Sequence, residues 1–76
     1  MMGNKYNFCK KIYEEQALKT GIKDFQNIAH ITYEIDDKNR YYVVTFEACI
    51  IDIDKIKKEF GNYILIETMR RKGIQL

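Results

Sequence analysis

The residues of this chain that could perform chemistry are few, and no catalytic spacing connects them. His30 is the single histidine, and it lies in an alternating segment that places Thr32 and Glu34 on the same face. A general base needs a group that orients it and a pocket that holds the substrate. The sequence supplies neither around His30, so we expect this side chain to be exposed on a strand.

The two cysteines, Cys9 and Cys49, could each provide a thiolate nucleophile. Cys9 falls within an apolar stripe when residues 5–20 are drawn as a helix, which is typical of a small core residue. Neither cysteine belongs to a Cys-x-x-Cys or Cys/His pattern of the kind that binds zinc. The two residues could form one disulfide bridge with each other, but we expect two free thiols, as is usual in a reducing compartment.

Acidic residues cluster in "EIDD" and "IDIDK" and could offer oxygen ligands to Mg²⁺ or Ca²⁺. Such sites need several converging oxygens, as in the D-x-D-x-D-G loop. Here Asp52 and Asp54 suit the start of a helix, and Asp36 and Asp37 suit a turn. No Gly-rich phosphate loop, G-x-S-x-G or H-E-x-x-H motif is present. The sequence thus predicts a protein that is not an enzyme and has neither a metal site nor a cofactor.

The size and composition set further bounds. A chain of 76 residues forms one domain, and a domain of this size buries only about 60% of its unfolded surface, so partner chains often complete its stability. The net charge of +2 is too balanced to imply a polyanionic partner by itself. No leader-like segment and no apolar run long enough to span a membrane is visible, so we expect a cytoplasmic protein without a membrane partner.

The predicted elements form a single α+β domain over residues 1–76. Asn4 caps a helix and Gly21 ends it in a left-handed conformation. Two alternating runs joined by "DDKN" form a hairpin in which Asn39 adopts a positive φ. Asp52 caps a second helix, and Gly61 ends it before an apolar third strand. The expected ranges are helix 5–20, strands 28–36 and 41–50, helix 52–60, strand 62–70 and tail 71–76.

The resulting order is α-β-β-α-β, a two-layer sandwich with both helices on one face. A strand–helix–strand connection is right-handed, which places the third strand parallel to the second in a three-stranded mixed sheet. This is the topology of a ferredoxin-like β-α-β-β-α-β domain without its first strand.

Two helices cover one face of such a sheet and leave the other exposed. We expect Tyr42, Val44, Phe46 and Ile50 to lie under the helices. The predicted interaction face on the other side consists of Tyr41, Val43, Thr45, Ile64 and Ile66. An apolar patch of this kind marks an interaction surface. We expect a second copy to cover it in a homodimer. A different protein, or the chain's own tail "GIQL", is the alternative cover.

Nucleic acid is the alternative partner. The candidate contacts are the basic residues Lys55, Lys57, Lys58, Arg70, Arg71 and Lys72. Aromatic side chains on an open sheet face could stack with bases, although Glu34 and Glu47 would repel phosphates.

These patterns predict a small, non-enzymatic protein-interaction module that occludes or bridges a macromolecular partner. More than half of the residues are Lys, Ile, Asn, Tyr, Phe or Met, which have AT-rich codons. This bias suggests a phage or mobile-element accessory protein, for example an anti-defence inhibitor of a host enzyme. A small nucleic-acid-binding regulator is the second interpretation.

Overall fold

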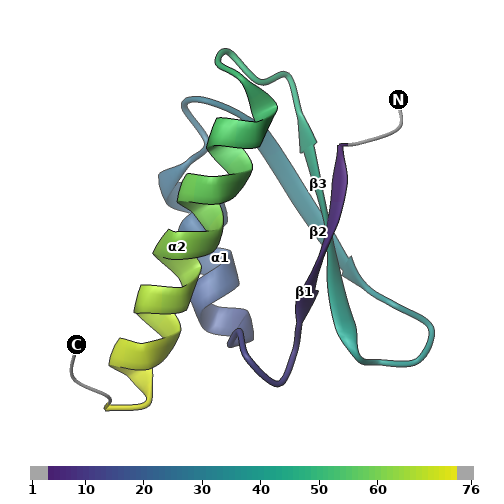
Figure 1. The fold of residues 1–76 in the computed structure, drawn as a ribbon, viewed down its shortest axis with the longest axis vertical. Helices are drawn as coiled ribbons and strands as arrows, with labels where there is room; N and C mark the ends of the chain where they lie inside the picture. The colour runs from purple at the N-terminus through teal and green to yellow at the C-terminus, as the bar shows by residue number, and fades with distance from the viewer. Residues whose placement is uncertain (1–3, 74–76) are drawn as a thin grey trace.

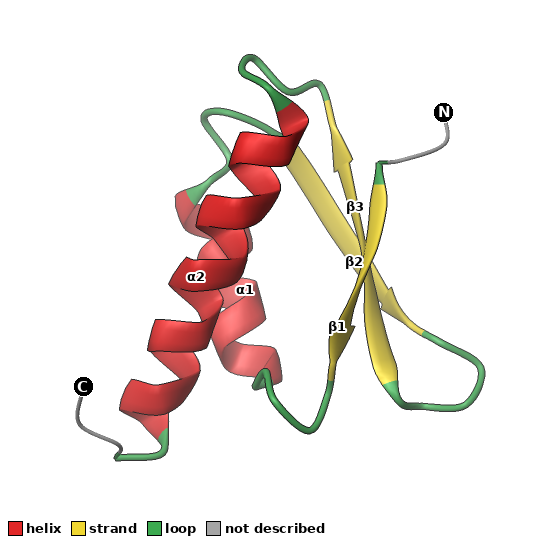
Figure 2. Ribbon diagram, in the orientation of Figure 1, coloured by secondary structure: helices red, strands yellow, loops and turns green. Residues whose placement is uncertain are grey.

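The computed structural model describes residues 4–73, which form a three-stranded sheet with two helices packed on one of its faces (Figure 1). Every neighbouring pair of strands is antiparallel, and the strand order across the sheet is β1-β3-β2 (Figure 2). The elements are β1 (Lys5–Cys9), α1 (Glu15–Asp24), β2 (His30–Ile35), β3 (Tyr41–Glu47) and α2 (Ile53–Arg71). The predicted α+β class is confirmed, whereas the observed order is β-α-β-β-α and the sheet is not mixed.

The predicted hairpin is confirmed, with strands slightly shorter than expected. Asn39 has a φ of 57°, as its place in the turn predicted. Asp36 fixes this turn, because one of its carboxylate oxygens accepts the backbone N–H groups of Arg40 and Tyr41 at 2.6 and 2.9 Å. These hydrogen bonds, that of Tyr41 first, hold the pKa of Asp36 below its usual value.

The predicted helix over residues 5–20 is wrong for residues 5–14, because α1 begins at Glu15. Residues 5–9 form β1, which pairs with β3 along its whole length. Tyr6 and Phe8 point to the core side, where their rings meet Phe46 and Phe60 edge-on. Asn4 caps no helix, and its carbonyl instead accepts the N–H of Phe46 at 2.9 Å. Long-range pairing with β3 therefore decides the conformation of this segment.

The predicted division of residues 52–70 into a helix and a strand is also wrong. The helix α2 continues through Gly61 to Arg71. Its buried residues recur every four positions, at Ile56, Phe60, Ile64 and Thr68, which is the spacing of one helix face. A glycine inside a helix is unfavourable by about 1 kcal/mol, and this periodic burial outweighs that cost. Of the predicted tail, residues 74–76 lie outside the described residues.

A close contact between the two helices explains Gly21, which was expected to end α1. The residue is instead buried inside α1, which continues to Asp24. A Cβ at Gly21 would lie 2.7 Å from Cγ2 of Ile64 and 3.0 Å from Cε1 of Phe60. Thr68 adds a polar link, since its hydroxyl donates to the carbonyl of Ile64 and accepts the N–H of Glu14. The glycine is needed for space and not for backbone conformation.

The two helical glycines should respond oppositely to alanine. Gly21→Ala forces the Cβ into Ile64 and Phe60, and we expect it to lower the free energy of unfolding by roughly 1–3 kcal/mol. Gly61→Ala places its Cβ 3.6 Å from Phe8, an ordinary contact, and should raise stability by roughly 0.5–1 kcal/mol. Urea denaturation of both variants measures the difference. Equal effects would contradict the helix contact.

Two tyrosine–carboxylate hydrogen bonds hold α1 and predict a loss of stability at alkaline pH. Burial, followed by the hydrogen bond to Glu15, raises the pKa of Tyr33 to about 12. The hydrogen bond to Asp24 is the main cause that raises the pKa of Tyr63 to about 12. A raised folded pKa gives stability that is complete below the ordinary value of 10.0 and is lost as the pH rises towards 12.

We therefore expect the free energy of unfolding to fall between pH 10 and 12. The double variant Tyr33→Phe/Tyr63→Phe should be less stable near neutral pH and should lose less stability over this interval. Denaturation at several pH values tests this. An identical pH profile for the variant and the parent would show that neither phenol contributes.

Candidate binding groove

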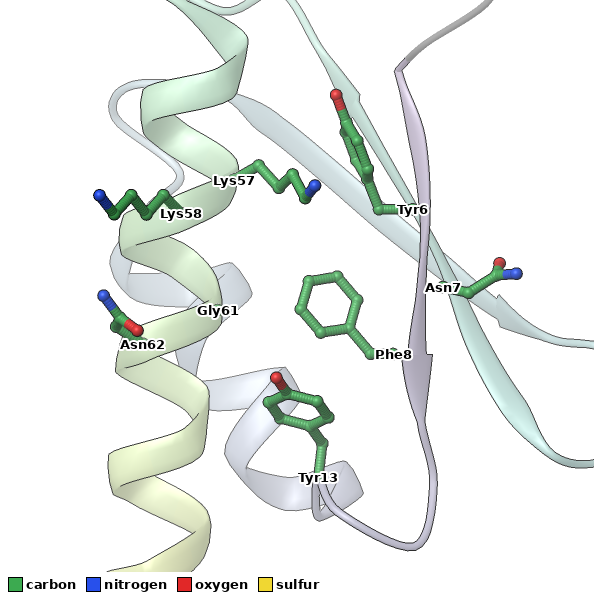
Figure 3. Close-up of a pocket in the computed structure, with 8 residues that line it drawn as sticks. All are labelled: Tyr6, Asn7, Phe8, Tyr13, Lys57, Lys58, Gly61 and Asn62. Atoms are coloured by element: carbon green, nitrogen blue, oxygen red, sulfur yellow. The ribbon is translucent and has the colours of Figure 1, made fainter.

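A groove of about 490 Å³ lies between α2 and β1 (Figure 3). Two segments that are distant in the sequence form it: β1 with the turn that follows it, and the middle of α2. The residues that line it are Tyr6, Asn7, Phe8, Tyr13, Lys57, Lys58, Gly61 and Asn62. Because the first of these segments was predicted to be helical, the sequence did not reveal this groove.

The floor of the groove is aromatic. Phe8 points from β1 towards α2, and Tyr13 stands below it with its ring centroid 5.1 Å from that of Phe8 (Figure 3). On the helix, Gly61 faces Phe8 without a side chain, and an added Cβ would only reach van der Waals contact. The absence of a side chain at Gly61 therefore keeps the middle of the groove open.

The charge along the groove has one sign. The ammonium group of Lys57 lies 4.3 Å from the ring centroid of Tyr6, which is the geometry of a cation–π contact. Lys58 and Asn62 lie on the outer side of α2 at the rim of the groove (Figure 3). None of the lining residues is acidic. Within residues 4–73 the one ion pair joins Arg70 to Glu67, so Lys57 has no carboxylate bound to it there.

The β1 side of the groove is the edge of the sheet. The carbonyl of Asn4 accepts the N–H of Phe46 in β3, and the N–H of Lys10 donates to the carbonyl of Arg40, the residue before β3. In an antiparallel pair, alternate residues of a strand direct their backbone groups towards the neighbour. The N–H and C=O groups of Lys5 and Asn7 therefore point away from β3, to the side where no strand of the described chain lies. Such groups are a template for another strand.

The predicted interaction face is divided by the structure. Tyr41, Val43 and Thr45 lie half-buried on the open face of the sheet, as expected. Ile64 and Ile66 were predicted to extend this face but lie on α2, where Ile64 is fully buried and Ile66 is 41% exposed. The register places polar neighbours around the central residues, namely Lys5, Asn7, Thr32, Glu34 and, near the edges, His30 and Glu47. The open face is a narrow apolar strip with polar flanks.

The predicted nucleic-acid contacts do not converge. Lys55, Lys57, Lys58, Arg70 and Arg71 are distributed along and around α2, and Lys72 follows its end. Arg70 pairs with Glu67 at 3.3 Å, and Arg71 donates to the hydroxyl of Thr20 at 3.4 Å. These six residues therefore lie in two groups, one near each end of α2.

The residues considered for chemistry are also dispersed. His30 is exposed opposite Glu47, and Cys9 lies on the open face of β1, not in the core of a helix as expected. Cys49 is half-buried against the core. Among residues 4–73, no three His, Cys, Asp or Glu side chains come close enough to hold a metal ion. In the same range, no helix combines the length and apolar character that crossing a membrane requires.

In comparisons with protein-family models, curated proteins and solved structures, none matches this chain. Its function must therefore be argued from its own surface.

The division of the predicted face can be tested with two lysine substitutions. Ile64→Lys places a charge in the contact with α1 and should lower stability by several kcal/mol, enough to unfold a domain of this size. Val43→Lys lies on the open face beside Glu34 and should change stability by no more than about 1 kcal/mol. Circular dichroism and urea denaturation distinguish them. A folded Ile64→Lys variant would contradict the helical assignment of residues 62–70.

Proposed function

We propose that this chain is a non-enzymatic protein-interaction module that binds an extended segment of another protein along β1. The observation that carries the proposal is the groove itself, which combines an unpaired strand edge with an aromatic floor and a helix wall. An extended peptide that joins an exposed sheet edge gains main-chain hydrogen bonds, and pockets for its alternate side chains provide specificity.

The topology supports the same location. We infer that the described residues form the first five elements of a ferredoxin-like β-α-β-β-α-β arrangement and not its last five. In that arrangement the strand after α2 pairs with β1 on the side away from β3. The described chain has no strand at that position. A segment of a partner would occupy it and bury Phe8 and Tyr13.

A different protein suits the groove better than a second copy. A two-fold dimer through β1 would bring the same surface of each copy together. Lys57 and Lys58 of both copies would then approach across a narrow interface, and like charges in such positions are unfavourable. We accordingly place the homodimer second. Occlusion of a host enzyme by this edge is the form that the predicted inhibitor function would take.

Selection of peptides from a displayed random library against the immobilised protein tests the proposal. We expect enriched peptides to shift the NMR amide signals of Lys5, Asn7 and Gly61. Perturbations confined to Tyr41, Val43 and Thr45, or to Arg70 and Arg71, would place the interface elsewhere and overturn it.

A matched pair of variants identifies strand addition. The N–H of Asn7 points away from β3, so Asn7→Pro removes an outward donor without removing a hydrogen bond of the sheet. We expect Asn7→Pro to lower the affinity for a selected peptide about tenfold or more, and Asn7→Ala to change this affinity by less than about threefold. Equal affinities would show that the partner does not pair with β1. Peptides methylated on alternate backbone nitrogens provide the same test without altering the protein.

A further inference from the structure

We propose that the groove selects an extended segment in which an acidic residue follows an apolar residue by two positions, with the segment antiparallel to β1. This inference rests on the proposed function and specifies the chemistry of the partner.

The spacing of the groove matches the spacing of a strand. Alternate side chains of an added strand would face α2 at intervals of about 6.5–7 Å. On α2, Gly61 and Lys57 are one turn apart, which is about 6 Å along the axis. On β1, Phe8 and Tyr6 repeat at the strand interval and line the same groove. Of two successive helix-facing side chains of the partner, one would therefore lie beside Gly61 and Phe8, and the other beside Lys57 and Tyr6.

The two positions differ in chemistry. The first lies over Gly61 and against the rings of Phe8 and Tyr13, where an apolar side chain fills the space that the glycine leaves. The second lies beside Lys57 and Tyr6, where the ammonium group stands over an aromatic ring and no lining residue is acidic. A carboxylate at that position would accept a charge-assisted hydrogen bond from the ammonium group of Lys57. Lys58 at the rim adds a second positive charge.

The hydrogen bonds available on β1 favour the antiparallel direction. Lys5 and Asn7 have outward N–H and C=O groups, whereas the carbonyl of Cys9 already accepts the N–H groups of Ile12 and Tyr13. In an antiparallel ladder one partner residue exchanges both bonds with one residue of β1, so two free residues suffice for two complete pairs. Because β1 runs from Tyr6 to Phe8, an antiparallel segment meets the apolar position first and the acidic position second.

The test uses short fluorescently labelled synthetic peptides in one Thr/Ser-rich host sequence. The panel contains Leu-x-Glu, Leu-x-Gln, Leu-x-Lys, the reversed Glu-x-Leu and the adjacent Leu-Glu. Fluorescence anisotropy at low salt compares their affinities, and NMR shifts of Lys5, Asn7 and Gly61 show whether each peptide binds in the groove. We expect Leu-x-Glu to bind tightest, about tenfold tighter than Leu-x-Lys.

Charge reversal on the protein provides the matched control. Lys57→Glu should lower the affinity for the Leu-x-Glu peptide about tenfold and should make Leu-x-Lys the preferred ligand. Lys55→Glu makes the same change in net charge on α2 but does not line the groove, so its effect should be less than about threefold. Denaturation curves establish that both variants remain folded, since both side chains are exposed.

The outcomes separate the two proposals. Groove binding with equal affinity for the Glu, Gln and Lys peptides overturns the acidic preference and leaves strand addition intact. Tighter binding of Glu-x-Leu overturns the antiparallel direction. If no peptide shifts the groove signals, both proposals fail. A concentration-dependent dimer that Asn7→Pro dissociates would show that a second copy occupies the groove. The proposal of an acidic partner segment would then be wrong.

Discussion

The close approach of α1 and α2 at Gly21 is the contact on which the rest of the structure depends. The missing side chain at Gly21 lets Phe60 and Ile64 pack directly against α1. The ring of Phe60 then reaches Phe8, Phe25 and Phe46, so one residue joins both helices to the sheet. Phe60 faces the core, and the next residue, Gly61, faces β1. The packing of α2 on one side thus determines the width of the groove on the other.

An edge strand with free backbone groups is a liability that proteins usually protect. Here β1 has only five residues and carries Lys5 on its open face, two features that discourage unspecific pairing. The groove beside it has the opposite character, since aromatic rings and a helical glycine leave room for another chain. Short length and charge restrict which strands could pair with β1, and under the proposed function the groove would favour those whose side chains fit it. This combination is expected of a selective edge.

The sequence predicted the hairpin and the burial of Tyr42, Val44 and Phe46 because alternation and turn residues act locally. Ile50, expected on the same core face, lies beyond the end of β3 and is 70% exposed, so that part of the prediction is wrong. The sequence did not predict β1, because five residues fit both a helical stripe and a short strand, and pairing with β3 decides between them. In α2, β-branched residues and Gly61 favour a strand and a break locally, yet burial of Ile64 and Thr68 requires the helix to continue. Because both segments were assigned wrongly, the groove could not be predicted. Lys57 and Lys58 were named as possible nucleic-acid contacts, but nothing in the sequence placed them beside Tyr6, Phe8 and Tyr13.

The groove and the open sheet face are parts of one continuous surface. A segment added to β1 would direct half of its side chains towards α2 and the other half to the open face, beside Lys5 and Asn7. The strip of Tyr41, Val43 and Thr45 lies one strand further in, and charges of both signs surround it. If a partner binds in the groove as proposed, this strip lies where it could contact the same partner. The sheet face predicted from the sequence would then extend an interface whose specificity resides at the edge.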